Sequence, residues 1–122
     1  MSRPAILVVG NCYPDNFTFD NWFNQHFDVE FLKAANRHQA LEVLAESAPE
    51  LVLINRVFDA DGGCGISLVR EIKESTPDCR VMLISNFADA QEKAVANGAL
   101  DGFGKAELNS VTTISKVRAA LG

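Results

Sequence analysis

Four polar side chains in this sequence are of types that could bind a phosphate or a similar anion. Asn55 and Arg56 follow one short apolar segment, Ser85 follows another, and Lys105 follows a glycine-rich stretch further along. Lys and Arg supply positive charge, and hydroxyl and amide groups supply hydrogen-bond donors, which are the groups that recognise phosphate oxygens. These four residues therefore predict a polar site if the fold brings them together.

The elements that would position these residues are indicated by the apolar pattern. Three continuous apolar segments, at 6–9, 51–54 and 81–84, are rich in branched side chains. Segments of this kind are typical of strands buried on both faces of a parallel sheet. Weaker strand patterns cover 29–32 and 100–104. The sequence therefore predicts five strands.

Apolar residues recur at helical spacing between the predicted strands. We predict helices over about 16–26, 38–47, 66–75, 89–97 and 110–121. Asn36 and either Asn109 or Ser110 are suitable N-terminal caps, and Gly98 is a suitable stop. The last helix is expected to bury Val111 together with the apolar residues that follow it at helical spacing. Five strands that alternate with five helices describe a doubly wound α/β domain.

In a doubly wound sheet, the functional crevice lies at the carboxyl ends of the strands. This rule selects Gly10 and Asn11 after the first strand, Asn55 after the third, Ser85 after the fourth and Lys105 after the fifth. The polar side chains listed at the outset are therefore expected to share one edge of the sheet.

These segments resemble the receiver domain of bacterial response regulators. The resemblance extends from Ile6 to Leu121, and it is carried by Ile6-Leu7-Val8-Val9, Pro49 to Asn55, Val81 to Ser85, Asn97-Gly98-Ala99 and Lys105. It implies a flavodoxin-like fold, with five helices and a five-stranded parallel sheet in the order 2-1-3-4-5. Residues 1–122 are expected to form a single receiver-like domain, either a stand-alone protein or the first domain of a longer chain.

The chemistry of that family is phosphoryl transfer from a phosphohistidine to an aspartate at the end of the third strand. Two acids after the first strand help to hold Mg²⁺, while a Ser or Thr and a Lys contact the phosphoryl group. The resemblance places Asn55 at the phosphoacceptor position and Gly10 and Asn11 at the positions of the two acids. Ser85 and Lys105 match the hydroxyl and the ammonium.

The sequence departs from the family pattern in three further places. Ala106 follows the lysine where the family usually has proline, and Gly102 stands where an aromatic residue is usual, with Phe103 one place later. The loop between Asn55 and Gly65 is two residues longer than usual. The switch-aromatic region is therefore altered together with the site.

These substitutions remove the groups that the family reaction needs. The neutral carboxamide of Asn55 is not a competent nucleophile toward phosphorus, and Gly10 and Asn11 supply none of the carboxylates through which Mg²⁺ is usually bound. We therefore predict a degenerate receiver domain with no catalytic residue, no metal and no cofactor. Lys105 is left without its expected carboxylate partner and should bond the side-chain oxygen of Asn55 or reach solvent.

A domain of this kind is expected to act in signal transduction through protein–protein contacts that do not depend on phosphorylation. The resemblance implies a docking face on the fourth helix, fifth strand and fifth helix, at about Ala88 to Lys116, for an output domain, a kinase, another regulator or a second copy. The first helix is a second candidate surface. Its aromatic residues exceed what one helix face can bury, and they are Phe17, Phe19, Trp22, Phe23 and Phe27.

Two other interpretations use residues near the same edge. In the first, Arg56, Ser85 and Lys105 line a neutral to positive pocket that senses a small anion or a nucleotide. In the second, Asp59 or Asp61 in the lengthened loop replaces the phosphoacceptor, although Asp-Ala-Asp-Gly-Gly is more typical of a solvated turn.

Cysteine patterns give two weaker hypotheses. Cys64 and Arg70 have the Cys-x5-Arg spacing of cysteine phosphatases, but Ile66 and Val69 between them have helical spacing, which favours a chance match. Cys12 and Cys64 both fall at the same end of the predicted sheet, and spacing leaves open whether they form a redox pair.

The composition excludes several classes of protein. The 122 residues contain 16 Asp and Glu against 11 Lys and Arg, for a formal net charge of -5, which argues against a nucleic-acid-binding surface. Three cysteines without a metal-type pair are typical of reduced thiols. The apolar segment 6–9 is too short for a signal peptide or a membrane span. We expect a cytoplasmic bacterial protein.

Overall fold

Five parallel strands form one sheet in the order β2-β1-β3-β4-β5, as predicted. The computed structural model describes residues 3–122. The strands are β1 (Ala5–Val9), β2 (Glu30–Ala34), β3 (Leu51–Asn55), β4 (Val81–Ile84) and β5 (Leu100–Phe103). The architecture is the flavodoxin-like, doubly wound α/β fold that the alternation of elements indicated.

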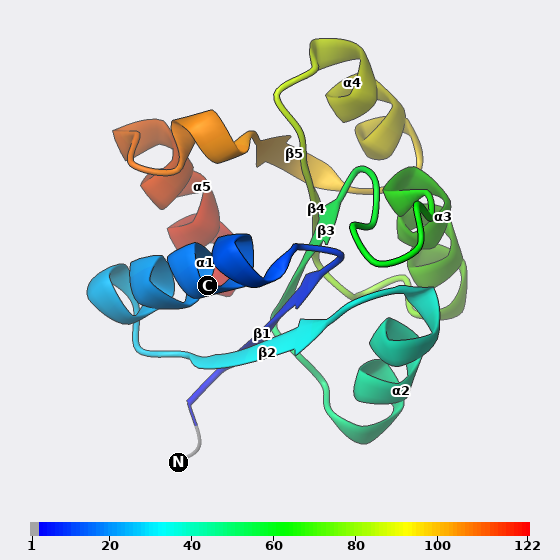
Figure 1. Cartoon of the computed structure of the whole chain (residues 1–122), viewed down its shortest axis with the longest axis horizontal. Helices are drawn as coiled ribbons and strands as arrows, with labels where there is room; N and C mark the ends of the chain where they lie inside the picture. The colour runs from blue at the N-terminus through cyan, green and yellow to red at the C-terminus, as the bar shows by residue number, and fades with distance from the viewer. Residues whose placement is uncertain (1–2) are drawn as a thin grey trace.

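Helices cover both faces of the sheet. They are α1 (Tyr13–His26), α2 (Arg37–Glu46), α3 (Gly65–Ser75), α4 (Ala88–Ala96) and α5 (Val111–Leu121), with a short 3₁₀ helix η1 (Lys105–Glu107) before α5. Figure 1 shows α1 and α5 on one side of the sheet and α2, α3 and α4 on the other. No helix within residues 3–122 is long and apolar enough to cross a membrane.

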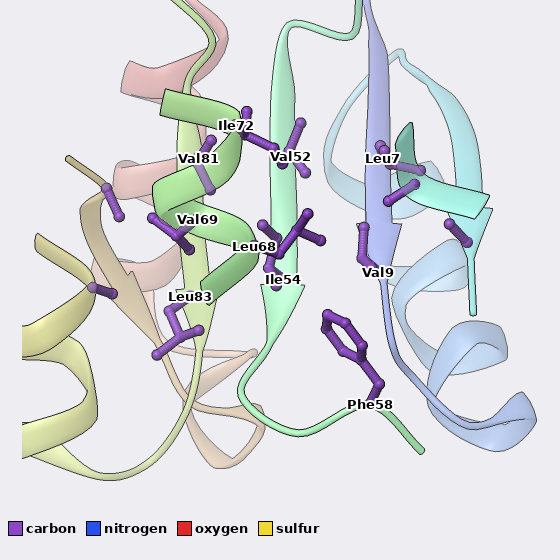
Figure 2. Close-up of a cluster of buried hydrophobic side chains, with 14 of the residues drawn as sticks. Leu7, Val9, Val52, Ile54, Phe58, Leu68, Val69, Ile72, Val81 and Leu83 are labelled. Carbon is purple, nitrogen blue, oxygen red and sulfur yellow. The ribbon is translucent and has the colours of Figure 1, made fainter. Parts of the chain in front are cut away.

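The sheet is buried on both faces because its central strands are apolar at every position. The side chains from Ile6 to Val9, and those from Leu51 to Ile54, have no exposed surface. Alternate residues point to opposite faces, so Leu7 and Val9 pack with α2, α3 and α4, whereas Ile6 and Val8 pack with α1 and α5. Figure 2 shows the first of these two cores.

Most element boundaries lie close to the predicted ones, and two of the predicted caps are present. Asn36 accepts a hydrogen bond from the backbone N–H of Gln39, and Ser110 accepts one from that of Thr112. The largest difference is at α1, which begins at Tyr13 and not at about residue 16. Pro14 is compatible with the first turn because that turn needs no backbone N–H donor.

One expectation about helix burial was wrong and another is confirmed. Val111 is 79% exposed at the start of α5, although it was expected in the core, because α5 buries the face of Thr113, Val117 and Ala120 and Val111 lies on the other side. In α1, Phe19, Trp22 and Phe23 are buried, whereas Phe17 is exposed. The aromatic residues of α1 therefore serve mainly as core, with one part left on the surface.

Candidate functional site

The fold brings four of the predicted site residues around one cavity. Asn55, Arg56, Ser85 and Lys105 line a cavity of about 210 Å³ at the carboxyl edge of the sheet. They reach it because β3, β4 and β5 are parallel neighbours and end at the same edge. Gly10 lies beside this cavity without lining it.

Asn55 is held in place by its own amide group. Its Nδ2 donates one hydrogen bond to the carbonyl oxygen of Val57 at 2.9 Å and a second to that of Gly10 at 3.3 Å. A carboxamide can make both bonds, whereas an ionised carboxylate has only acceptor oxygens. The surroundings of residue 55 therefore favour a hydrogen-bond donor, because a carboxylate at this position would face two carbonyl oxygens.

The space over Gly10 is filled by the ring of Phe58. A Cβ at Gly10 would lie 2.4 Å from Cδ1 of Phe58, and Gly10 has a φ of 88°, a conformation that favours glycine. Phe58 is 2% exposed and belongs to the core that contains Val9 and Ile54. Figure 2 shows its ring pointing back toward the sheet, between the ends of β1 and β3.

The lengthened loop after β3 positions Phe58 over Gly10. Val57 and Cys64 form an antiparallel bridge, and the N–H of Phe58 donates to the carbonyl oxygen of Gly63 at 2.9 Å. The N–H of Asp59 donates to the carbonyl oxygen of Gly10, also at 2.9 Å, which ties the loop to the end of β1. The loop thus folds as a tight hairpin that covers the first strand.

The two loop acids lie at the outer end of this hairpin, as the solvated-turn interpretation predicted. Asp59 and Asp61 are exposed, and the Asp61 carboxylate accepts a hydrogen bond from the N–H of Gly63 at 2.9 Å. Neither acid lines the cavity beside Asn55. They have no place in the site.

The residues at this edge do not fit a Mg²⁺ ion. Gly10 offers no side chain, Asn55 offers at most a neutral amide oxygen without charge, and Phe58 lies over the end of β1. Asn11 is 6% exposed, and neither polar atom of its side chain has a partner within residues 3–122. No group of three or more His, Cys, Asp or Glu side chains gathers for a metal in that part of the chain.

The structure corrects the expectation for Lys105. Its Nζ lies 2.5 Å from Oδ2 of Asp15, in the first turn of α1, so the lysine has a carboxylate partner and does not bond Asn55. The hydrogen bond from Lys105 lowers the pKa of Asp15, against the opposing effect of partial burial. This ion pair neutralises a cation that was expected to make the pocket positive.

Ser85 and Arg56 are both tied to the loop that follows β4. The Ser85 hydroxyl accepts a hydrogen bond from the N–H of Phe87 at 3.1 Å, and the Arg56 guanidinium lies 5.2 Å from the centre of the Phe87 ring. The distance to the ring is typical of a cation–π contact. Phe87 therefore links the loops after β3 and β4 across the top of the cavity.

The switch-aromatic region is rigidly held. Phe103 is 2% exposed and stacks on Phe19 of α1, with 6.4 Å between ring centres. At Gly102, the backbone N–H donates to Oε1 of Gln91, whose Nε2 donates to the carbonyl oxygens of Leu83 and Ser85. A Cβ at Gly102 would lie 2.1 Å from the Leu83 carbonyl oxygen, so the close approach of the strands requires glycine.

Cys12, Cys64 and Cys79 are free thiols. A hydrogen bond with Ser67 is the main cause that lowers the pKa of the Cys64 thiol. The residues from Gly65 to Arg70 form the first turns of α3 and not the phosphate-binding loop that the Cys-x5-Arg spacing would need. The phosphatase match is therefore a coincidence of spacing, as predicted.

Comparisons with known proteins agree with this fold. No protein-family model matches the chain. The chain is 27% identical to sporulation initiation phosphotransferase F of Bacillus subtilis over 107 residues, which are 86% of this chain and 84% of that protein. The receiver domain of NtrX from Brucella abortus matches 95% of this chain and 97% of its own, with 25% identity and a TM-score of 0.82.

Two further structures show how widely the likeness extends. A response regulator from Thermotoga maritima has a TM-score of 0.80 at 22% identity, with 98% of each chain covered. A longer NtrX structure from Brucella abortus matches 99% of this chain at 26% identity with a TM-score of 0.81, but the chain spans only 26% of its length. The fold is that of a response-regulator receiver domain.

Sequence reasoning missed two residues of the site, Phe58 and Asp15. The longer loop was noticed, and Phe58 is a large apolar residue within it, which is the signal that could have identified it. Asp15 lies four residues beyond Asn11, in a first helical turn that the prediction placed outside the helix. These contacts depend on how the loop after β3 and the first turn of α1 pack against the sheet. Residue spacing does not specify that packing.

Proposed function

We propose that this chain is a degenerate receiver domain of a signal-transduction protein, which acts through protein–protein contacts that do not depend on phosphorylation. The receiver fold provides the scaffold, and the positions for the phosphoacceptor and the metal acids are Asn55, Gly10 and Asn11. Ser85 and Lys105 are retained at the positions of the hydroxyl and the ammonium. The domain would work in the cytoplasm and carry out no catalysis.

The observation that carries this proposal is the packing around the end of β1. Phe58 occupies the space over Gly10, and Asn55 donates to the carbonyl oxygens of Gly10 and Val57. An acyl phosphate needs a carboxylate with room for a phosphoryl group, and its metal needs carboxylate oxygens close by. The donor amide of Asn55 supplies no carboxylate nucleophile, and the apolar ring over Gly10 leaves no place for a metal-binding carboxylate there.

The test is to add Mg²⁺ together with acetyl phosphate, or with beryllofluoride as a phosphoryl mimic, to the ¹⁵N-labelled protein. We expect the amide NMR spectrum to stay essentially unchanged. Saturable shifts of the amides of Asn55 and Lys105 would contradict the proposal. The Asn55→Asp variant should also fail to incorporate phosphate, because Gly10 and Asn11 still supply no acid; phosphate incorporation would show that those two positions matter less than proposed.

Sensing of a small anion or nucleotide is the second candidate function. It is supported by the cavity of about 210 Å³ that Arg56, Ser85 and Lys105 line together. It is weakened by the Asp15 carboxylate, which lies 2.5 Å from Lys105 and offsets its charge. A thermal-shift measurement with inorganic phosphate and with nucleotides separates the two functions, since a ligand that binds the native state raises the melting temperature.

The partner surface in this proposal is the face formed by α4, β5 and α5, at about Ala88 to Lys116. This face carries the exposed apolar side chains of Val95 and Leu100. Exposed Tyr13 and Phe17 make α1 the second candidate surface, and either could join two copies of the chain. The separate variants Val95→Ser and Phe17→Ser test the two surfaces. Only the variant on the surface that a partner uses should weaken binding of that partner.

A further inference from the structure

We infer that the cavity between α4, β5 and η1 receives an aromatic side chain from a partner segment that is rich in Lys or Arg. Docking here rests on the proposed function, because a domain that acts without phosphate needs a surface that is competent in the unmodified protein. The inference adds the chemistry of the partner, which the proposed function leaves open.

The first observation is the shape of the cavity. It has a volume of about 630 Å³, and Phe87, Val95, Gln91 and Gly102 line it. Phe87 is 58% exposed and Val95 is 46% exposed at this surface. Concave sites with apolar walls and a few polar groups are the ones that bury a large anchor side chain.

The second observation is that hydrogen bonds fix the positions of the elements that form the cavity walls. The Gln91 amide bonds the carbonyl oxygens of Leu83 and Ser85 and the N–H of Gly102, so α4 is fixed to both β4 and β5. Phe103 is stacked against Phe19 and is buried, so it is not free to swing outward into the cavity. Binding to a cavity that already exists loses less conformational entropy than binding to one that must first form.

The third observation is the charge around the opening. Glu92, Asp101 and Glu107 line it with carboxylates, whereas Lys116 is the one cation among its lining residues. Lys116 pairs with one of these carboxylates, because its Nζ lies 3.0 Å from Asp101 and 2.9 Å from the Gly102 carbonyl oxygen, so Glu92 and Glu107 carry the remaining charge. The opening is therefore negative, which complements a cationic segment and repels an acidic one.

An aromatic anchor fits this site better than an aliphatic one. The exposed ring of Phe87 can pair with a second ring, an arrangement that adds to the gain from buried area. Aromatic and Arg side chains are also the residues that dominate binding energy at protein interfaces. Basic residues on both sides of the anchor would then meet Glu92 and Glu107.

The test uses short synthetic peptides labelled with fluorescein, each with a central Trp, Phe, Leu or Ala between flanks that are either Lys/Arg-rich or Glu/Asp-rich. Fluorescence anisotropy with the unmodified protein should rank Trp and Phe in basic flanks first. Replacement of the aromatic residue by Ala should weaken binding roughly thirtyfold, as expected for an anchor residue. Equal binding of the Ala peptide, or of the acidic peptides, would overturn the inference.

Matched protein variants locate the contact. Glu92→Lys should weaken binding of the basic Trp peptide roughly fivefold, whereas Glu74→Lys, the same change on α3 away from the cavity, should have no effect. Val95→Ser should also weaken binding, and Val111→Ser, at a more exposed valine of α5, should not. Equal effects within either pair would show that the peptide binds elsewhere.

Repeating the titration with Mg²⁺ and acetyl phosphate separates this inference from the proposed function. Binding that is the same with and without phosphodonor supports both. Binding that develops only with phosphodonor would contradict the proposed function and keep the cavity as the docking site. The absence of binding under both conditions, with an unchanged NMR spectrum, would overturn the docking inference alone.

Discussion

Two parts of the carboxyl edge of this sheet have opposite characters. At the end of β1, the ring of Phe58 covers Gly10, and beside it the amide of Asn55 bonds two backbone carbonyl groups. At β5 and α4, by contrast, a cavity of about 630 Å³ stays open to the surface. In the proposed function, the first region has lost its chemistry and the second is the place where a partner docks.

Both regions depend on a glycine that admits a side chain from elsewhere in the chain. Gly10 makes room for the Phe58 ring, and Gly102 makes room for the Gln91 amide. The Phe58 ring is apolar and extends the core to the end of β1. The Gln91 amide instead connects the backbones of two strands and forms part of a cavity wall that stays open to the surface.

The largest expected effect is on the free energy of unfolding, and it should differ between two phenylalanines, one in each region. Phe58→Ala should destabilise the protein by about 3–5 kcal/mol, because a fully buried ring is lost and a cavity remains. Phe87→Ala should cost less than about 1 kcal/mol, since that ring is mostly exposed and mainly contacts Arg56. Urea unfolding of both variants checks the difference, and similar losses of stability would contradict the contrast between the two regions.

A second prediction compares Gly10, at the end of β1, with Gly62 in the lengthened loop. Gly10→Ala should cost about 2–4 kcal/mol, because it combines backbone strain at positive φ with the close contact to Phe58. Gly62→Ala, at a φ of 71° with open space around it, should cost only the strain of about 1–2 kcal/mol.

The double variant Gly10→Ala/Phe58→Ala provides the control for the glycine comparison. When the ring is absent, Gly10→Ala should cost no more than Gly62→Ala does in the wild-type background. Urea unfolding of the three variants measures this coupling. Additive costs at Gly10 and Phe58 would show that the ring is not what restricts the end of β1.

The third prediction concerns the amide at the phosphoacceptor position. Asn55→Asp should destabilise the protein by about 1–3 kcal/mol at pH 7, because two hydrogen bonds are replaced by repulsion between a carboxylate and carbonyl oxygens. The pKa of the new carboxyl should rise, so the cost should shrink at low pH, where the protonated group can donate. Asn97→Asp, whose amide bonds one carbonyl group at the exposed end of α4, is the matched control. Equal costs at the two positions would contradict the proposed role of Asn55.

The parts of the fold that the sequence predicted are those governed by continuous or periodic burial. The segments 6–9, 51–54 and 81–84 are apolar at every position because strands in a doubly wound sheet are covered on both faces. The caps at Asn36 and Ser110 were predictable because a side chain bonds a backbone N–H only a few residues away. Local and periodic features therefore specified the elements and most helix boundaries, whereas the strand order was implied by the resemblance to receiver domains.

The parts that the sequence did not predict are contacts across the loops. The identities of Asn55, Gly10 and Lys105 were readable, but the ring that covers Gly10 comes from a loop, and the acid that pairs with Lys105 comes from α1. The expectation that Lys105 lacks a carboxylate partner was wrong for this reason, because Asp15 lies ninety residues from Lys105 in sequence. The path of a loop and the first residue of a helix depend on packing against the rest of the fold, which residue spacing does not predict.

The smallest expected effect concerns the ion pair between Lys105 and Asp15, which lies between the two regions. The pKa of Asp15 is lowered chiefly by the hydrogen bond from Lys105. The pair therefore contributes stability above the pKa of an unfolded-chain aspartate, about 3.9, and the contribution is lost as the pH falls through the lowered value in the folded protein. Because both side chains are about a third exposed, we expect a coupling of at most about 1 kcal/mol at neutral pH.

A double-mutant cycle with Asp15→Asn and Lys105→Gln measures this coupling by urea unfolding across the acidic range. The coupling should weaken with added salt, because partly exposed charges are screened. Asp15→Asn also leaves Lys105 without its counter-charge, so inorganic phosphate should stabilise this variant more than the wild type if the neighbouring cavity can hold an anion at all. A wild-type protein that phosphate stabilises just as strongly would favour anion sensing over docking, because the pocket would then bind anions in spite of Asp15.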